Sequence, residues 1–485
     1  MRMEGQAAYN EPSRPIPVMG EYDVVVCGGG PSGCAAAIAA ARHGARTLLI
    51  EKDGYLGGAT VSQLVCVILS TNGVDFQGIW HDYARGLRER GGLRELTGFP
   101  CDRHTDGDRD GAGAQHTRGN IHGCVDPETV KYVWDDLLTG AGVEMLHHVY
   151  GCTCMIEDSA VSGVVVESRA GRRAIRAGRV IDCTGDGIVA AQAGVEWEQG
   201  DGEHPYAMAL TKVFRLGGLA RDLAPLDEAT MREIGAALED AVKRGVYDTP
   251  VVTEQTRLLS YIQGRNWRLP ERRREMLSVI SRVLKVDPLD PFDLTRAERE
   301  GREQARQAAD FYVRRVPGCE DGYLLDTSAQ IGLRSSRRLR GLATVTEADA
   351  REFRTYPDSI ARSSWSIDVW PADSYAAPAV DRTSQEALDR HERLRAGEYF
   401  DIRYGCIVAA GLDNLLMAGR CISAEHVAES SLRIQQTCMA TGEAAGVSAA
   451  LSLRADTTPR ELDPQIVVRQ LETDRDVEPA YAELG

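Results

Sequence analysis

Apolar and polar positions near the start of the chain follow a strand–helix–strand order. Residues 23–27 (DVVVC) are a short β-branched apolar run of the kind that forms buried parallel strands. Residues 34–43 are a helical run that stops at Gly44, and residues 47–50 are a second apolar run that ends at Glu51. Two short apolar strands joined by a helix predict an α/β fold with parallel strands.

Later segments predict further elements of the same sheet. Alternation over 152–179 indicates a β meander, and the apolar run at 180–182 indicates a strand that leads out of it. The small residues of 439–446 indicate a helix that packs closely against its neighbour. The other expected elements are a helix at 127–139, a strand at 143–149, a strand pattern at 207–216, an amphipathic helix at 293–316 and a late strand at 412–420.

The turn between the first strand and the first helix reads Gly-Gly-Gly-Pro-Ser-Gly, a Gly-x-Gly-x-x-Gly motif. Gly28 permits the tight turn, Gly30 lets a pyrophosphate approach the backbone, and Gly33 allows close packing of the helix. Free N–H groups at the helix start favour phosphate. Glu51 is placed to accept hydrogen bonds from a ribose diol, and it disfavours a ligand with a 2′-phosphate. The motif predicts a dinucleotide site formed by Gly28, Gly30, Pro31, Ser32, Gly33, Glu51 and Lys52.

Four motifs in this order resemble the FAD-dependent oxidoreductase family of the glutathione-reductase-like flavoprotein superfamily. They are Glu-Lys at 51–52, Leu-Gly-Gly at 56–58, Cys-Thr-Gly-Asp at 183–186 and Ala-Gly-Arg-Cys-Ile-Ser-Ala at 418–424. The resemblance covers about residues 20 to 452 and implies FAD as the cofactor. It implies further cofactor contacts at Gly57, Gly58, Ala59, Thr60, Val149, Thr184, Gly185, Asp186, Gly419, Arg420, Ile434 and Gln435.

The implied fold class is α/β: a Rossmann-type FAD-binding domain built from discontinuous segments, with an inserted mixed α+β substrate or cap domain. The insert has no second Gly-x-Gly-x-x-Gly, and the chain has no Cys-x-x-Cys. The protein is therefore not built like a disulfide reductase. The expected divisions are a flexible N-terminal arm (1–20), a first FAD-binding segment (21–202), the substrate or cap domain (203–400), a second FAD-binding segment (401–455) and a C-terminal tail (456–485). The insert is interpreted as a cap over the flavin, with an oligomerisation surface as the alternative.

Residues 98–124 are rich in Gly, Asp, Cys and His. The spacing of the cysteines and histidines matches no standard closed zinc site, so no metal is expected. The segment is interpreted as a flexible surface loop, with a lid as an alternative role.

Three residues outside the cofactor motifs are candidates for catalysis. His426 follows the late strand and is a candidate general base or hydrogen-bond donor, with a structural histidine as the alternative. Arg433 is a candidate for neutralising reduced flavin or for holding a carboxylate substrate, with a structural ion pair as the alternative. Arg334, in a cluster of arginines, is expected to face the pocket.

These features predict a dehydrogenase or oxidase that transfers a hydride between a small organic substrate and flavin, with dioxygen or an external acceptor completing the cycle. A flavin-dependent monooxygenase is the alternative reaction. A non-catalytic flavoprotein that serves as a binding or assembly partner is the alternative from another class.

Composition and charge limit the partners and the compartment that we expect for the protein. The 485 residues include 56 Lys+Arg and 72 Asp+Glu, and the net charge of −16 argues against nucleic acid or an anionic membrane as partner. No apolar stretch approaches the roughly 18 residues of a spanning helix, and residues 1–20 lack the features of an export signal. The twelve cysteines are scattered, several in apolar runs, which is typical of reduced thiols in the cytoplasm. The sequence is compatible with a homo-oligomer but does not predict one.

Overall fold

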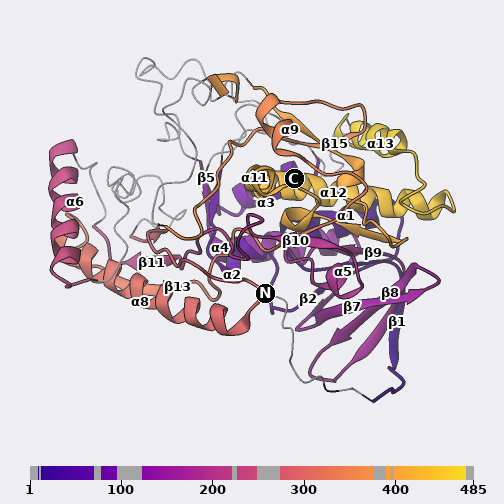
Figure 1. Ribbon diagram of the computed structural model, residues 1–485, viewed down its shortest axis with the longest axis horizontal. Helices are drawn as coiled ribbons and strands as arrows, with labels where there is room; N and C mark the ends of the chain where they lie inside the picture. Colours follow the sequence, from indigo (N-terminus) through magenta and orange to yellow (C-terminus); the bar gives the residue numbers. More distant parts are fainter. Residues whose placement is uncertain are drawn as a thin grey trace.

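The computed structural model describes residues 9, 12–69, 78–95, 123–220, 227–247, 274–374, 389–390, 392–394 and 397–476. Its largest sheet has seven strands in the order β6-β2-β1-β9-β8-β7, with β17 paired to β9 (Figure 1). The strands are β1 (Val18–Cys27), β2 (Thr47–Glu51), β6 (Glu144–His147), β7 (Tyr150–Glu157), β8 (Ala160–Glu167), β9 (Arg173–Asp182) and β17 (Leu415–Met417).

Five of these strands are parallel and end at one edge of the sheet. Cys27, the last residue of β1, lies opposite both Ile50 of β2 and Asp182 of β9. Met417 of β17 also lies opposite Asp182, and β6 pairs in parallel with β2. The turns that follow these strands therefore meet at one edge, where open α/β sheets bind their ligands.

Strand β9 pairs in two different ways along its length. Its first half pairs antiparallel with β8, over residues 173–176, and its last residues, 180–182, pair in parallel with β17. The meander of β7, β8 and β9 thus extends the parallel sheet on one side, as the alternation in the sequence predicted.

Helices α1 (Pro31–Arg42) and α12 (Gln435–Arg454) pack against each other over the sheet. A Cβ added to Gly442 would lie 2.1 Å from the carbonyl oxygen of Ser32, and one on Gly446 would lie 2.2 Å from that of Ala36. The two backbones therefore touch, and the expectation that small residues allow close helix packing is confirmed. Helices α3 (Ile79–Glu89) and α4 (Pro127–Gly140) pack beside them.

The insert 203–400 contains both strands and helices. Strands β11 (Phe214–Gly217), β12 (Met276–Ser278) and β13 (Tyr323–Thr327) form a sheet in the order β12-β11-β13. The long helix α8 (Pro291–Arg315) buries Phe311 and Tyr312 against this unit, which lies far from β7 and β8 (Figure 1). The strand predicted at 207–216 is wrong for most of its length, because residues before Phe214 make isolated bridges rather than a ladder.

The remaining elements are short or peripheral. They are α2 (Ala59–Ser62), β3 (Val67–Ile68), β4 (Leu93–Glu95), β5 (Gly123–Val125), α5 (Ile188–Gln192), β10 (Trp197–Gln199), α6 (Glu228–Lys243), β14 (Arg337–Leu339), α9 (Glu347–Glu352), β15 (Ser359–Ser363), β16 (Phe400–Arg403), α11 (His426–Leu432) and α13 (Pro464–Asp476).

The predicted fold class is confirmed, but the ends of the chain differ from expectation. The C-terminal tail contains α13, which joins the core through Leu462, Val467 and Leu471. The apolar residues 467 and 471 are spaced one helical turn apart, so they share one face of α13. In the N-terminal arm, β1 already begins at Val18. The loop 98–124 lies outside the described residues except for its last two.

Among the described residues, no helix is both long and apolar enough to cross a membrane.

Candidate active site

A pocket lies at the edge where the parallel strands end. Its wall is formed by the turns after β1, β2 and β9, by α2 and by the start of α12. Fifteen of the predicted cofactor residues line it: Gly28, Gly30, Pro31, Ser32, Glu51, Lys52, Gly58, Ala59, Thr60, Val149, Thr184, Gly185, Asp186, Arg420 and Gln435.

Four predicted cofactor residues do not line the pocket: Gly33, Gly57, Gly419 and Ile434. A Cβ on Gly33 would lie 1.7 Å from the carbonyl oxygen of Gly28, so this glycine lets α1 start directly against the turn. A Cβ on Gly419 would lie 2.6 Å from Oγ of Ser32. Gly33 and Gly419 therefore shape the wall from behind, where any side chain would push the wall residues apart.

The dinucleotide end of the pocket is a cradle between two glycine turns. Gly30, the N-cap of α1, has extended backbone angles (φ −75°, ψ 179°), and no side chain caps the helix. A Cβ on Gly30 would meet nothing closer than Cα of Gly58, at 3.8 Å. The free N–H groups of the first turn of α1 and the open space beside Gly30 fit the pyrophosphate of a dinucleotide.

Glu51 closes this end of the pocket. Its Oε2 accepts from the N–H of Gly29 at 2.6 Å and its Oε1 from the N–H of Asp53 at 2.8 Å. Burial raises the pKa of this carboxyl, and the two backbone donors oppose the shift. A carboxylate has about four acceptor positions, so Glu51 keeps capacity for further hydrogen bonds, and its predicted contact with the ribose hydroxyls stays a prediction.

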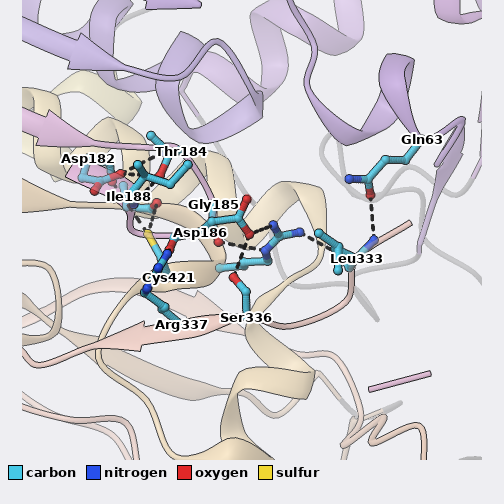
Figure 2. Close-up of polar contacts among 12 residues, drawn as sticks. Gln63, Asp182, Thr184, Gly185, Asp186, Ile188, Leu333, Ser336, Arg337 and Cys421 are labelled. Carbon is cyan, nitrogen blue, oxygen red and sulfur yellow. Dashed lines mark hydrogen bonds and ion pairs between the residues drawn. The ribbon is translucent and has the colours of Figure 1, made fainter. Parts of the chain in front are cut away.

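The turn after β9 is anchored by a buried carboxylate that the sequence did not single out. Asp182 accepts from the N–H and Oγ1 of Thr184 at 3.0 and 2.7 Å, and from the N–H of Ala190 at 2.9 Å (Figure 2). Burial raises the pKa of Asp182, and these donors oppose the shift. Asp182 thereby fixes the Thr-Gly-Asp turn that faces the pocket.

Arg420 ties this turn to the insert. Its Nε donates to the carbonyl oxygen of Gly185 at 2.8 Å, its Nη1 to that of Leu333 at 2.7 Å, and its Nη2 to Oδ1 of Asp186 (Figure 2). Oγ of Ser336 donates to the same carboxylate at 2.7 Å. All three guanidinium nitrogens are used by the protein, so Arg420 holds the pocket wall together even though it lines the pocket.

We expect Arg420→Lys to lower the free energy of unfolding by about 1–3 kcal/mol, because one ammonium group cannot reach all three acceptors. Urea unfolding of the purified protein measures this. Arg460→Lys is the control, since Arg460 also bonds Asp413, Ala409 and Leu412 but is about one-third exposed. Equal losses in the two variants would contradict the role assigned to Arg420.

The other end of the pocket lies at the start of α12. Gln435 lines it, and the N-cap residue Ile434 offers no side-chain cap, so the first N–H groups of this 20-residue helix are not used within it. Gln63 also lines this end, and its Oε1 accepts from the N–H of Leu333 at 3.3 Å (Figure 2).

Twelve lining residues were missed from the sequence: Cys27, Ile50, Asp53, Ser62, Gln63, Val65, Tyr150, Gly151, Cys183, Ile188, Gln330 and Cys438. Most are neighbours of motif residues and could have been found by extending each motif. Gln63 and Gln330 carry no local signal.

The structure separates the three catalytic candidates. Arg433 lines the pocket and pairs with Asp368 at 2.7 Å. His426 and Arg334 do not line it. Burial, and then Arg338, lower the pKa of His426 to about 4, so this imidazole is neutral at pH 7. Arg334 donates to the carbonyl oxygen of Ala209 and lies 4.8 Å from the ring centre of Trp370, away from the place expected for it.

A buried glutamate lies behind the arginines. Glu429 is 1% exposed, its Oε2 lies 3.4 Å from Arg338, and its Oε1 has no hydrogen-bond partner among the described residues. Burial raises its pKa to about 7, although the charges of Arg338, Arg420 and Arg433 oppose the shift. Glu429 therefore changes charge near neutral pH.

A family model described as FAD dependent oxidoreductase matches residues 23–472. The chain is 42% identical to dihydrolipoyl dehydrogenase of Trypanosoma brucei brucei over 89 residues, which is 18% of each protein. It is 40% identical to mitochondrial dihydrolipoyl dehydrogenase of Schizosaccharomyces pombe over 72 residues, 15% of this chain and 14% of that enzyme. The matches span less than a fifth of these relatives.

Among solved structures, the chain is similar to a geranylgeranyl bacteriochlorophyll reductase-like protein from Thermoplasma acidophilum, with 14% identity and a TM-score of 0.44, over 93% of this chain and 82% of that one. It is also similar to an anhydrotetracycline hydroxylase from Streptomyces rimosus, with 12% identity and a TM-score of 0.44, over 94% of this chain and 66% of that one.

Proposed function

The chain belongs to the FAD-dependent oxidoreductase family, and from this premise we propose that it is a dehydrogenase or oxidase of a small organic substrate. It is an enzyme, and FAD is its cofactor. FAD supplies two-electron chemistry, here the transfer of a hydride to or from the substrate. Dioxygen or an external carrier is the proposed acceptor that completes the cycle.

One observation carries this proposal: a single pocket connects the dinucleotide cradle at Gly30 with polar residues at the start of α12. In this arrangement α1 and Glu51 would hold the ADP half of FAD. Gln435 and the first turn of α12 would face the flavin half, where free N–H groups favour negative charge. Gln63 and Arg433 then remain at that end to orient a substrate.

The proposal also includes the compartment and the partners of the protein. All described cysteines are free thiols, which supports a reducing compartment, and we propose the cytoplasm. The proposed partners are a small-molecule substrate and the electron acceptor, without nucleic acid or membrane, and a homo-oligomer is compatible with this function.

The test begins with an absorbance spectrum of the purified protein, where peaks near ~370 and ~450 nm indicate bound flavin. Anaerobic mixing with candidate substrates should then bleach the ~450 nm band. If instead NADPH is oxidised rapidly and a hydroxylated product appears, the protein is a monooxygenase and the proposal is wrong. A colourless protein that cannot be reconstituted with FAD would contradict the assignment of the pocket.

A further inference from the structure

We propose that the substrate is a carboxylate and that Arg433 binds its anionic group at the α12 end of the pocket. This inference rests on the proposed function and adds the chemical class of the substrate to it. It is carried by the hydrogen bonds of Arg433, by the contrast with Arg420 and by the distribution of charge along the pocket.

Arg433 is fixed in place but keeps donors to spare. Its Nη2 donates to Oδ2 of Asp368 at 2.7 Å and to the carbonyl oxygen of the same residue at 3.0 Å. Its Nε is buried, and neither Nε nor Nη1 donates to an acceptor among the described residues. Nη1 is therefore the donor that is left to a ligand, and a charge-assisted hydrogen bond from it to a carboxylate oxygen is stronger than one to a neutral amide.

Arg420 shows the contrast within the same pocket. It also lines the pocket, but its three nitrogens donate to Gly185, Leu333 and Asp186. Its hydrogen-bonding capacity is largely used within the protein, whereas that of Arg433 is not. Arg433 is therefore the pocket arginine that is built to receive a ligand.

Charge is distributed unevenly along the pocket. At the dinucleotide end, Glu51 offers acceptors to the ribose hydroxyls, and Asp53 is paired with Lys52 at 2.9 Å. At the α12 end, burial raises the pKa of Cys438 to about 12, and the charges of Arg420 and Arg433 oppose that shift, so both arginines act on one stretch of the wall. The two arginines place positive charge at this end, where an anionic group of the substrate can be held.

The groups behind the wall add to the positive charge. The charges of Arg338, Arg420 and Arg433 act on Glu429. Burial keeps this carboxyl partly protonated, and therefore partly neutral, near pH 7. In a chain with a net charge of −16, the two arginines that line this end of the pocket, Arg420 and Arg433, favour an anionic substrate.

The test compares matched pairs of probes that differ only in charge: benzoate with benzamide, and acetate with acetamide. Binding to the FAD-loaded protein is measured by isothermal titration calorimetry and by the change in the flavin spectrum. We expect at least one carboxylate to bind about tenfold or more tightly than its amide. Arg433→Gln should weaken that carboxylate about ten- to a hundredfold, the range for losing a hydrogen bond to a charged group, and leave the amide unchanged.

Arg403→Gln is the matched control, because Arg403 also pairs with an aspartate, Asp358 at 3.1 Å, but does not line the pocket. It should leave the carboxylate affinity unchanged. Arg433→Lys should restore little, since a single ammonium cannot pair with Asp368 and also hold the ligand where Nη1 does.

Equal affinities for both carboxylates and their amides would overturn the inference, as would an unchanged carboxylate affinity in Arg433→Gln. If Arg433→Gln instead loses FAD or shifts the flavin potential while carboxylates bind as before, Arg433 serves the cofactor and the inference is wrong. Because calorimetry needs no turnover, these outcomes are separate from a failure of the proposed reaction, which would appear as flavin that no substrate reduces.

Discussion

Gly30→Val is expected to yield folded protein that has lost its FAD. The φ of −75° at Gly30 suits any residue, and a Cβ there meets nothing closer than 3.8 Å, so the chain can fold around the new side chain. The two methyl groups of valine would then occupy the space beside the first turn of α1, where free N–H groups would hold the pyrophosphate. We expect FAD to bind about a hundredfold or more weakly, a loss near ~3 kcal/mol.

The measurement is the ratio of flavin to protein absorbance after purification, followed by titration of the apoprotein with FAD and by circular dichroism. Gly33→Ala is the contrasting variant. A Cβ at Gly33 would lie 1.7 Å from the carbonyl oxygen of Gly28, so this smaller change should lower the stability itself. A Gly30→Val protein that retains FAD would overturn the placement of the pyrophosphate.

The second large effect is a loss of stability as the pH rises from about 4.5 towards neutrality, caused by Glu429. The pKa of this carboxyl is about 7 in the folded protein, above its ordinary value of 4.5. Between these values the unfolded chain releases a proton that the folded protein retains. The free energy of unfolding therefore falls as the pH rises from 4.5 to about 7, by on the order of 3 kcal/mol in total.

Glu429→Gln removes the titrating group and should remove this pH dependence. Between about pH 4 and pH 8, the free energy of unfolding of the variant should rise relative to that of the wild type by about 3 kcal/mol. Urea unfolding at a fixed, saturating concentration of FAD measures this difference. Glu198→Gln is the control, because Glu198 also approaches Arg338, at 3.8 Å, but is 67% exposed. Parallel stability curves for Glu429→Gln and the wild type would show that Glu429 does not titrate in this range.

The two ends of the pocket differ in how far sequence alone could describe them. At the dinucleotide end the residues are local: strand, glycine turn, helix and acid lie within about thirty residues of one another. Each glycine there is required by the steric limits of its own turn, so the spacing of the motif already indicates its role. The sequence therefore predicted the cofactor, the fold class and most of this wall, including Gly28, Gly30, Glu51 and Gly58.

The α12 end was decided only by the tertiary structure. Gln63 and Arg433 lie far apart in the chain and line one pocket because the strands, the insert and α12 pack together. The spare donors of Arg433 depend on Asp368, and the titration of Glu429 depends on burial among three arginines, so neither follows from local spacing. Sequence determines local backbone geometry, because steric limits act between near neighbours. Hydrogen-bond partners and burial come from packing between distant segments, and these decided which candidate residues face the pocket.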